Sequence, residues 1–186
     1  MSKKELIYEA ALRLFNTYGF DKTPTSQIAR EAGVATGTLF HYFPTKEELI
    51  NSLYLQCKES MISRIFQGVD EEKSYRAKIR RAYENMLRWG VFAREEFLFF
   101  QQFSNSPAIL DSTHEAAETR FKPVMNLVLQ GIEQEILKGI DPQLLLNAVM
   151  GMIMSNVLYL MGRSELLEEP DFLETTFAMV WDAIKK

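Results

Sequence analysis

Apolar residues recur at helical spacing along most of this chain, and this periodicity restricts its fold more than any other feature. In the first stretch, the apolar residues take positions i, i+3, i+4 and i+7 of one helical face. They are Ile7, Ala10, Ala11, Leu14, Phe15 and Tyr18. Stripes of the same kind continue to residue 184, and no alternating strand pattern competes with them. The periodicity therefore predicts an all-α fold.

Sharp breaks set the limits of the next helices. Thr25 is expected to cap a second helix, and Gly33 to end it, because glycine enters the left-handed region at little cost. A third helix is expected over 36–42. The run 45–48, Thr-Lys-Glu-Glu, has capping-box spacing and predicts a long fourth helix that ends near Gly68.

Five further helices are expected in the rest of the chain. Their ranges are roughly 74–92, 94–104, 108–138, 142–162 and from 170 onward. The chain has no tether rich in glycine or serine. We therefore place the boundary between an N-terminal head, 1–46, and a body, 47–186, within helical structure at the start of the fourth helix.

The charge distribution limits how the head can hold a nucleic acid. The formal net charge of the chain is −4, which argues against non-specific coating of nucleic acid. In the first 48 residues, six basic side chains balance six acidic ones. They are Lys3, Lys4, Arg13, Lys22, Arg30 and Lys46 against Glu5, Glu9, Asp21, Glu31, Glu47 and Glu48. A neutral head must rely on a few cations placed at phosphates.

No set of residues in the chain is typical of an enzyme. There is one cysteine, there are two histidines, and no glycine-rich phosphate loop or metal-ligand spacing is present. We therefore expect no enzymatic activity, no metal and no cofactor. The lone cysteine fits a reducing compartment, and no secretion signal follows Lys3 and Lys4, which together predict a cytoplasmic protein.

Residues 25–46 have the layout of a helix-turn-helix followed by a capped helix. A helix that enters the major groove of DNA needs small or polar leading residues. We predict that Thr36 and Thr38 contact base edges and that Gly37 permits close approach of the backbone. The predicted phosphate contacts are Thr25, His41, Tyr42 and Lys46. A plain helical hairpin would also fit this pattern.

The head resembles the tetracycline-repressor (TetR-like) family of transcriptional regulators. The resemblance is carried by Ile28-Ala29-x-x-Ala32-Gly33-Val34, Gly37-Thr38-Leu39-Phe40-His41-Tyr42-Phe43 and Lys46-Glu47-Glu48-Leu49. It covers residues 5–50. It implies nine helices, three in the head and six in the body, and a homodimer whose last two helices form a four-helix bundle with those of a second copy. It also implies a ligand-responsive regulator, most often a repressor.

Two positions depart from the pattern of that family. Ala35 stands where a serine often caps the recognition helix, and a lost cap costs about 1 kcal/mol unless Thr36 replaces it. Phe40 stands where tyrosine is common, so a hydroxyl that can bond a phosphate is missing. With the neutral head, these departures leave an alternative function open: a helical small-molecule-binding or protein-interaction module whose head does not read DNA.

The resemblance implies an effector pocket between the body helices, and the body is rich in aromatic and methionine side chains. Such a lining suits an apolar or aromatic effector. The candidate pocket residues are Met86, Trp89, Phe100, Phe103, Phe121, Met125 and Tyr159. Apolar residues at helical spacing are, however, more often simply core.

The segment from Gln143 to Gly162 carries no charged residue. A helix that is apolar nearly all round must be covered on both sides, here by the body and by a partner chain. The candidate dimer residues are Met150, Gly151, Met154, Ser155, Leu158, Phe177, Val180 and Trp181. The segment is also about long enough to span a bilayer, but its scattered polar residues favour a buried helix and no membrane attachment.

Two further residues have open roles. His114 is the only histidine outside the head and is either a surface group or a contact that responds to a ligand or to pH. Cys57 lies on the apolar stripe of the fourth helix, where burial favours an inert thiol over a redox switch. The main hypothesis is a homodimeric repressor of a palindromic double-stranded DNA operator, released by a small apolar or aromatic effector.

Overall fold

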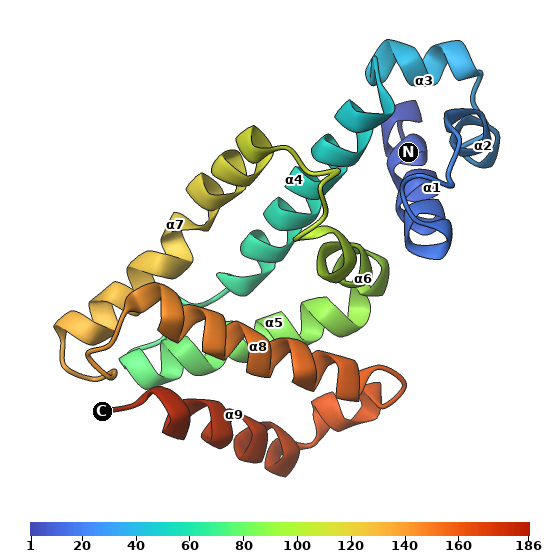
Figure 1. The fold of residues 1–186 in the computed structure, drawn as a ribbon. Helices are drawn as coiled ribbons and strands as arrows, with labels where there is room; N and C mark the ends of the chain where they lie inside the picture. Colours follow the sequence, from blue (N-terminus) through green and yellow to red (C-terminus); the bar gives the residue numbers. More distant parts are fainter. The chain divides into compact units, whose positions relative to one another are not determined.

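The computed structural model describes residues 1–186 and consists of helices (Figure 1). They are α1 (Lys3–Tyr18), α2 (Thr25–Glu31), α3 (Thr36–Tyr42), α4 (Lys46–Ile65), α5 (Tyr75–Phe92), α6 (Arg94–Phe103), α7 (Asp111–Glu133), α8 (Pro142–Leu160), the short 3-10 helix η1 (Ser164–Glu168) and α9 (Pro170–Ile184). The predicted all-α fold with nine α-helices is confirmed.

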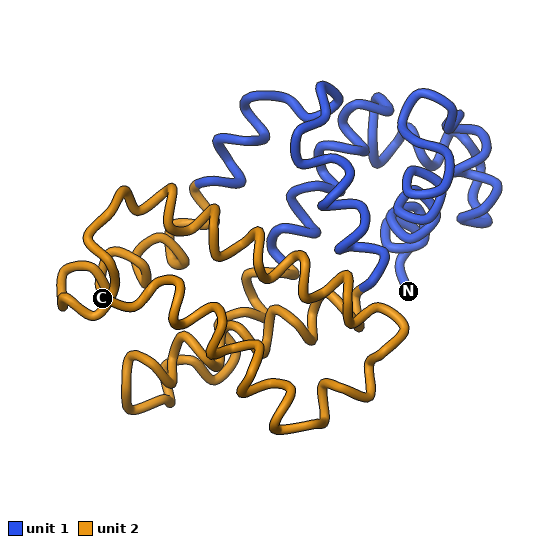
Figure 2. The backbone as a smooth tube through the Cα atoms, turned by 60° about the horizontal axis from the view of Figure 1, so that its bottom comes forward, with its two compact units in different colours: residues 1–59, 94–118 blue, residues 60–93, 119–186 orange.

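The chain forms two compact units (Figure 2). Unit 1 comprises residues 1–59 and 94–118, and unit 2 comprises residues 60–93 and 119–186. Helices α4 and α7 each begin in unit 1 and end in unit 2. The predicted boundary after residue 46 divides the chain by the function expected of each part. The two compact units divide it differently, because unit 1 combines α1 to α3 with most of α4, with α6 and with the first turns of α7.

Helix α1 begins with an unpredicted capping box. The Ser2 hydroxyl accepts a hydrogen bond from the Glu5 amide at 3.2 Å, and the Ser2 amide donates to the Glu5 carboxylate at 2.7 Å. The helix ends at Gly19, whose φ of 79° suits glycine. The predicted apolar face is buried except at Tyr18, which is 53% exposed. The expectation for Tyr18 was wrong because α1 ends there and no following turn covers the ring.

The turn between α2 and α3 is closed at Gly33, as predicted, with a φ of 65°. The Val34 amide donates to the Ala29 carbonyl at 3.0 Å, and the Val34 side chain packs against the core of unit 1. Thr25 does not cap α2. Pro24 occupies the N-cap position and Thr25 is the first helical residue, because the extended backbone of Pro24 already leads the chain into the helix.

Asn51, on α4, links that helix to the segment that precedes α7 within unit 1. Its side chain is buried. The amide group donates to the carbonyls of Glu47 at 2.7 Å and Ala108 at 3.0 Å, and the amide oxygen accepts from the Leu110 backbone at 2.9 Å. A buried polar side chain is tolerated when its hydrogen-bonding groups have partners. The Asn51 side chain has three such partners, all of them backbone groups.

Unit 2 is built from α5, α8 and α9 with the adjoining parts of α4 and α7. The Tyr75 hydroxyl donates to the Leu127 carbonyl at 2.8 Å, and a Cβ added at Gly131 would overlap that hydroxyl. Close packing of α5 on α7 therefore requires glycine at this position. Helix α7 ends at Glu133 and not near residue 138 as predicted, because Glu135 takes a positive φ of 56° that breaks the helical path.

Helix α8 buries one side in unit 2 and leaves the other exposed. Ile153 and Val157 are buried, whereas Leu144, Leu158 and Tyr159 are 61%, 42% and 53% exposed. By length and composition alone, α8 is the one helix that could cross a membrane, and 28% of that stretch is buried. Core helices pass the same test, so the criterion does not assign a membrane span.

Candidate nucleic-acid interface and apolar cavity

The start of helix α3 presents a surface of small and polar groups. Thr36 and Gly37 are exposed and Thr38 is half-buried, while Leu39 is fully buried in the core of unit 1 and anchors the helix. A Cβ added at Gly37 would meet no atom within 4 Å. This face is therefore open and narrow enough to approach the floor of a major groove.

The end of α3 carries three exposed rings in sequence. Phe40 is 42% exposed, Tyr42 is 39% exposed, and His41 is exposed as well. The rings of His41 and Tyr42 meet edge to face, with centroids 5.4 Å apart. His41 and Tyr42, which are both predicted to bind phosphates, thus contact each other. Phe40, whose ring has no hydroxyl group, precedes them in the helix.

Lys46, the first residue of α4, lies over an aromatic ring. Its ammonium nitrogen is 4.3 Å from the centroid of the Phe20 ring, within cation–π range. Phe20 in turn packs against Phe15, with centroids 5.7 Å apart. The Thr45 hydroxyl accepts a bond from the Glu48 amide at 3.0 Å, which is one half of the predicted capping box. These contacts give Lys46 a defined position at a helix N-terminus.

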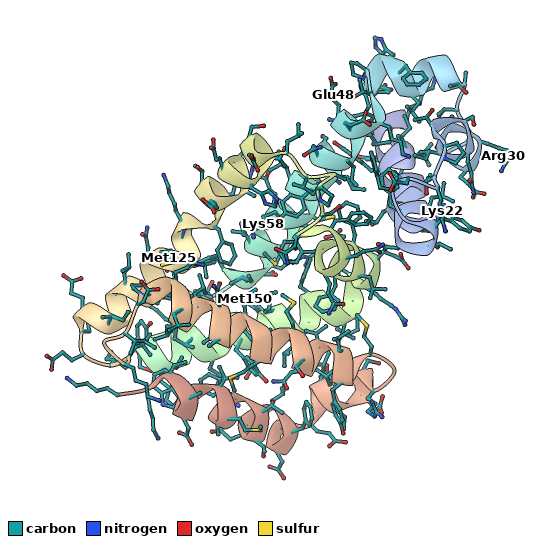
Figure 3. The ribbon with its side chains drawn as sticks, viewed as in Figure 1. Lys22, Arg30, Glu48, Lys58, Met125 and Met150 are labelled. Atoms are coloured by element: carbon teal, nitrogen blue, oxygen red, sulfur yellow. The ribbon has the colours of Figure 1, made fainter.

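Phe20 was not among the predicted site residues. It lies between α1 and α2, and no periodic spacing links position 20 to position 46, so the pair becomes visible only in the folded chain. Lys22 and Arg30 are further exposed cations of unit 1 that were not singled out (Figure 3). In the sequence, only their positive charge marked these two residues as possible phosphate contacts.

Unit 2 contains a partly open apolar cavity of about 80 Å³ between the end of α4 and helices α5, α7, α8 and α9. Its lining residues are Ile65, Ile79, Ala82, Tyr83, Met86, Val124, Val128, Leu137, Leu145, Leu146, Val149, Met150, Ile153, Val180 and Ile184. None is charged. The Tyr83 hydroxyl accepts a bond from the Asn156 side chain at 3.1 Å, and burial raises the pKa of the Tyr83 phenol, so this group stays neutral.

Two family models together match almost the whole chain. Residues 7–53 match the family described as bacterial regulatory proteins, tetR family, and residues 54–186 match a tetracyclin repressor-like C-terminal domain. This chain belongs to the TetR family. The recognition helix and the body thus both have counterparts in one family, whose members are transcriptional regulators and not enzymes.

Solved structures of TetR-family regulators share the fold of this chain. One from Shewanella sp. PV-4 is 31% identical, covers 100% of both chains and gives a TM-score of 0.91. One from Marinobacter aquaeolei VT8 is 24% identical, covers 99% of this chain and 96% of its own, and gives a TM-score of 0.89. The HTH-type transcriptional regulator YuxN of Bacillus subtilis is 34% identical over 89 residues, which span 46% of this chain and 31% of YuxN. The chain is a DNA-binding transcriptional regulator.

The seven predicted pocket residues of this TetR-family chain are not gathered in one cavity. Met86 lines the cavity of unit 2. Phe121 and Met125 do not line it but pack against a core cluster whose five buried members all line the cavity, and Trp89 is buried and is not among the lining residues. Figure 3 shows Met125 on α7 and Met150, which does line the cavity, on α8.

The other three predicted pocket residues have different surroundings. Phe103 lies in the core of unit 1 with Phe100 packed against it, and Tyr159 is 53% exposed. The described cavity is lined by aliphatic side chains and a single aromatic ring, Tyr83, and so differs from the aromatic-rich lining that was expected. Large rings fill space themselves and become core, whereas the cavity remains between smaller aliphatic side chains.

The predicted dimer residues divide into exposed and buried groups. On α8, Gly151, Ser155 and Leu158 are exposed and Met154 is half-buried, so these four stay available to a partner. Their spacing of three or four residues places them on one face of the helix. This face is the opposite side of α8 from the buried Ile153.

Of the remaining four predicted dimer residues, Phe177 and Val180 face the interior of unit 2, whereas Met150 and Trp181 are half-buried. Phe177 and Val180 are 0% and 1% exposed, and the Trp181 ring stacks on the Phe177 ring, with centroids 6.1 Å apart. Met150 lines the cavity. The apolar stripe of α9 packs inward, as shown by the Phe177 and Tyr83 rings 5.7 Å apart, because α9 must first cover the core of its own chain.

Two residues with open roles now have defined surroundings. Burial, and then the carboxylate of Glu96, raise the pKa of the Cys57 thiol, which is the environment of an unreactive cysteine. The His114 ring lies edge-on to the Tyr54 ring at 5.7 Å. No group of three or more His, Cys, Asp or Glu side chains is arranged to hold a metal ion.

Proposed function

We propose that this chain is a cytoplasmic, homodimeric repressor of a palindromic operator and that a small apolar effector releases it from DNA. The observation that carries the proposal is the exposed start of α3, with no atom near Gly37, beside the exposed ring of Tyr42 and the ordered ammonium of Lys46. A slim helix flanked by phosphate-binding groups is what a major-groove reader requires.

Each predicted contact has a distinct role in this proposal. Thr36 and Thr38 contact base edges or a thymine methyl group, and they determine sequence preference. Tyr42 and Lys46 bind phosphates and set the position of α3 along the duplex, together with Thr25 and His41. Gly37 keeps the backbone close to the bases.

A second copy of the chain is needed for operator selection. Helix α3 has seven residues and reads too few base pairs to select a site alone. The exposed face of α8, which includes Gly151, Ser155 and Leu158, supports an isologous contact between two copies. Such a contact also covers the apolar surface that would otherwise suggest a membrane.

Selection of duplexes from a random library tests the DNA-binding part of the proposal. We expect enrichment of a palindrome whose half-sites lie about one helical turn apart, roughly 34–36 Å, or a multiple of it. Failure to enrich any sequence at low salt, with the protein folded and able to bind an apolar ligand, would instead favour the small-molecule-binding or interaction module whose head does not read DNA.

A further inference from the structure

We infer that the cavity of unit 2 is the effector site and that it takes the end of a saturated aliphatic chain rather than an aromatic ring. Thirteen of its fifteen lining residues are valine, leucine, isoleucine or methionine, and Tyr83 is the only aromatic one. Flat ligands are usually held by flat side chains, whereas flexible aliphatic groups fit a methylene chain. The inference rests on the proposed function in one respect, namely that the ligand acts as an effector.

The size of the cavity favours a chain over a ring. An apolar cavity of about 150 Å³ is known to admit benzene in another protein, and this cavity has about 80 Å³. That is space for about two to three groups the size of a water molecule. A ring would require the helices to separate, whereas two or three methylene groups in line enter the existing space.

The polarity of the cavity determines which part of the ligand enters it. No charged side chain lines the cavity, and its one hydroxyl, on Tyr83, is already engaged by the side chains of Asn156 and Thr176. A charged group placed there would lose its hydration without a partner. The polar end of the ligand must therefore stay outside, so the cavity recognises a terminal hydrocarbon segment.

The cavity adjoins the helix that carries the proposed dimer face. Met150 and Ile153 line the cavity from one side of α8, and Gly151 and Ser155 are exposed on the other. A ligand that fills the cavity adds contacts to the inner side of this helix and so favours the helix position that makes those contacts. Since packed helices move as rigid elements, a preferred position of the inner side also fixes the outer face and so alters the contact between copies.

A series of carboxylates with one headgroup and different apolar parts tests the ligand class. Butyrate, hexanoate, octanoate and decanoate are compared with benzoate and 2-naphthoate by calorimetric titration of the full-length protein, with no DNA present. We expect affinity to rise about fourfold for each added methylene group until the two or three that the cavity holds are in place, and then to level off from about hexanoate onward. Benzoate or 2-naphthoate binding as tightly as octanoate would overturn the inference.

Two substitutions and a matched control locate the binding site. Ala82→Leu fills the cavity from α5 and should abolish octanoate binding, whereas Ala77→Leu, on the same helix but outside the lining, should leave it unchanged. Val124→Ala enlarges the cavity and should move the plateau of the series to a longer chain. Unchanged octanoate affinity in folded Ala82→Leu protein, or an unmoved plateau in Val124→Ala, would contradict the site. Because DNA takes no part, loss of operator binding alone leaves this result intact.

Discussion

The ammonium nitrogen of Lys46 lies 4.3 Å from the centroid of the Phe20 ring and joins the start of α4 to the loop between α1 and α2. A free lysine side chain carries about 2 kcal/mol of rotamer entropy, part of which is lost when it binds a phosphate. Contact with a ring that is itself packed on Phe15 orders the lysine before DNA arrives. Because the first 48 residues carry no net charge, such ordering makes one cation more effective.

Replacing Phe20 by leucine should weaken operator binding about two- to fivefold, which corresponds to an exposed cation–π contact of roughly 0.5–1 kcal/mol. The measurement is fluorescence anisotropy with a labelled operator duplex. In the Lys46→Ala background the same change should have no further effect, since the lysine it orders is gone. Tyr18→Leu, another exposed aromatic residue near this loop, is the control and should bind as the wild type does. Equal losses in both backgrounds would mean that Phe20 acts independently of Lys46.

Replacing Gly37 by alanine should separate folding from DNA binding. No atom lies within 4 Å of the new Cβ, and alanine in a helix is favoured over glycine by about 0.5–1 kcal/mol, so the melting temperature should rise slightly. Operator affinity should fall, because the methyl group stands on the face that approaches the bases. Thermal unfolding and anisotropy on the same sample check both effects. An unchanged affinity would show that the backbone at this position stays away from DNA.

Replacing Asn51 by alanine should destabilise the fold by about 1–3 kcal/mol, since it leaves the Leu110 amide and the Ala108 carbonyl without their partner. Denaturant titration at fixed protein concentration measures this change in the free energy of unfolding. Gln56→Ala, at an exposed position of the same helix, serves as the control and should have an effect below about 0.5 kcal/mol. Similar values for the two variants would refute a structural role of Asn51.

Replacing Leu158 by glutamate should convert the dimer to a monomer and reduce operator affinity, because a charge would be buried without a partner at the proposed contact. Sedimentation velocity gives the oligomeric state. Leu129→Glu provides a matched charge on α7, at a residue that is 45% exposed compared with 42% for Leu158. That control should remain dimeric. If Leu158→Glu also remains dimeric, the exposed face of α8 is not the interface.

Local patterns predicted most of the helices and the head. Glycine at positions 19 and 33 and the Thr45 cap act within a few residues, so their effects could be foreseen from neighbouring positions. The limits of α3 followed from the same signals. The error at the start of α2 was also local: Thr25 was expected to be the cap, but the extended backbone of its neighbour Pro24 already takes that position.

The cavity could not be predicted because it depends on what neighbouring side chains leave unfilled. Phe103 and Trp89 looked like ligand contacts by residue type, but both are buried in packed regions. The cavity instead lies among residues such as Val124 and Ile153, whose types are those of any core. Pairs such as Phe20 and Lys46 pose the same difficulty, since contacts between distant positions follow no period in a single sequence.

The most direct test of the account is operator binding by the wild type and by Lys46→Ala, measured by anisotropy at several salt concentrations on the selected palindrome and on a scrambled duplex of equal composition. The account predicts preference of the wild type for the palindrome, affinity that falls steeply with salt, and a salt slope reduced by about one in Lys46→Ala. Equal affinity of the wild type for both duplexes, or binding that is insensitive to salt, would contradict it.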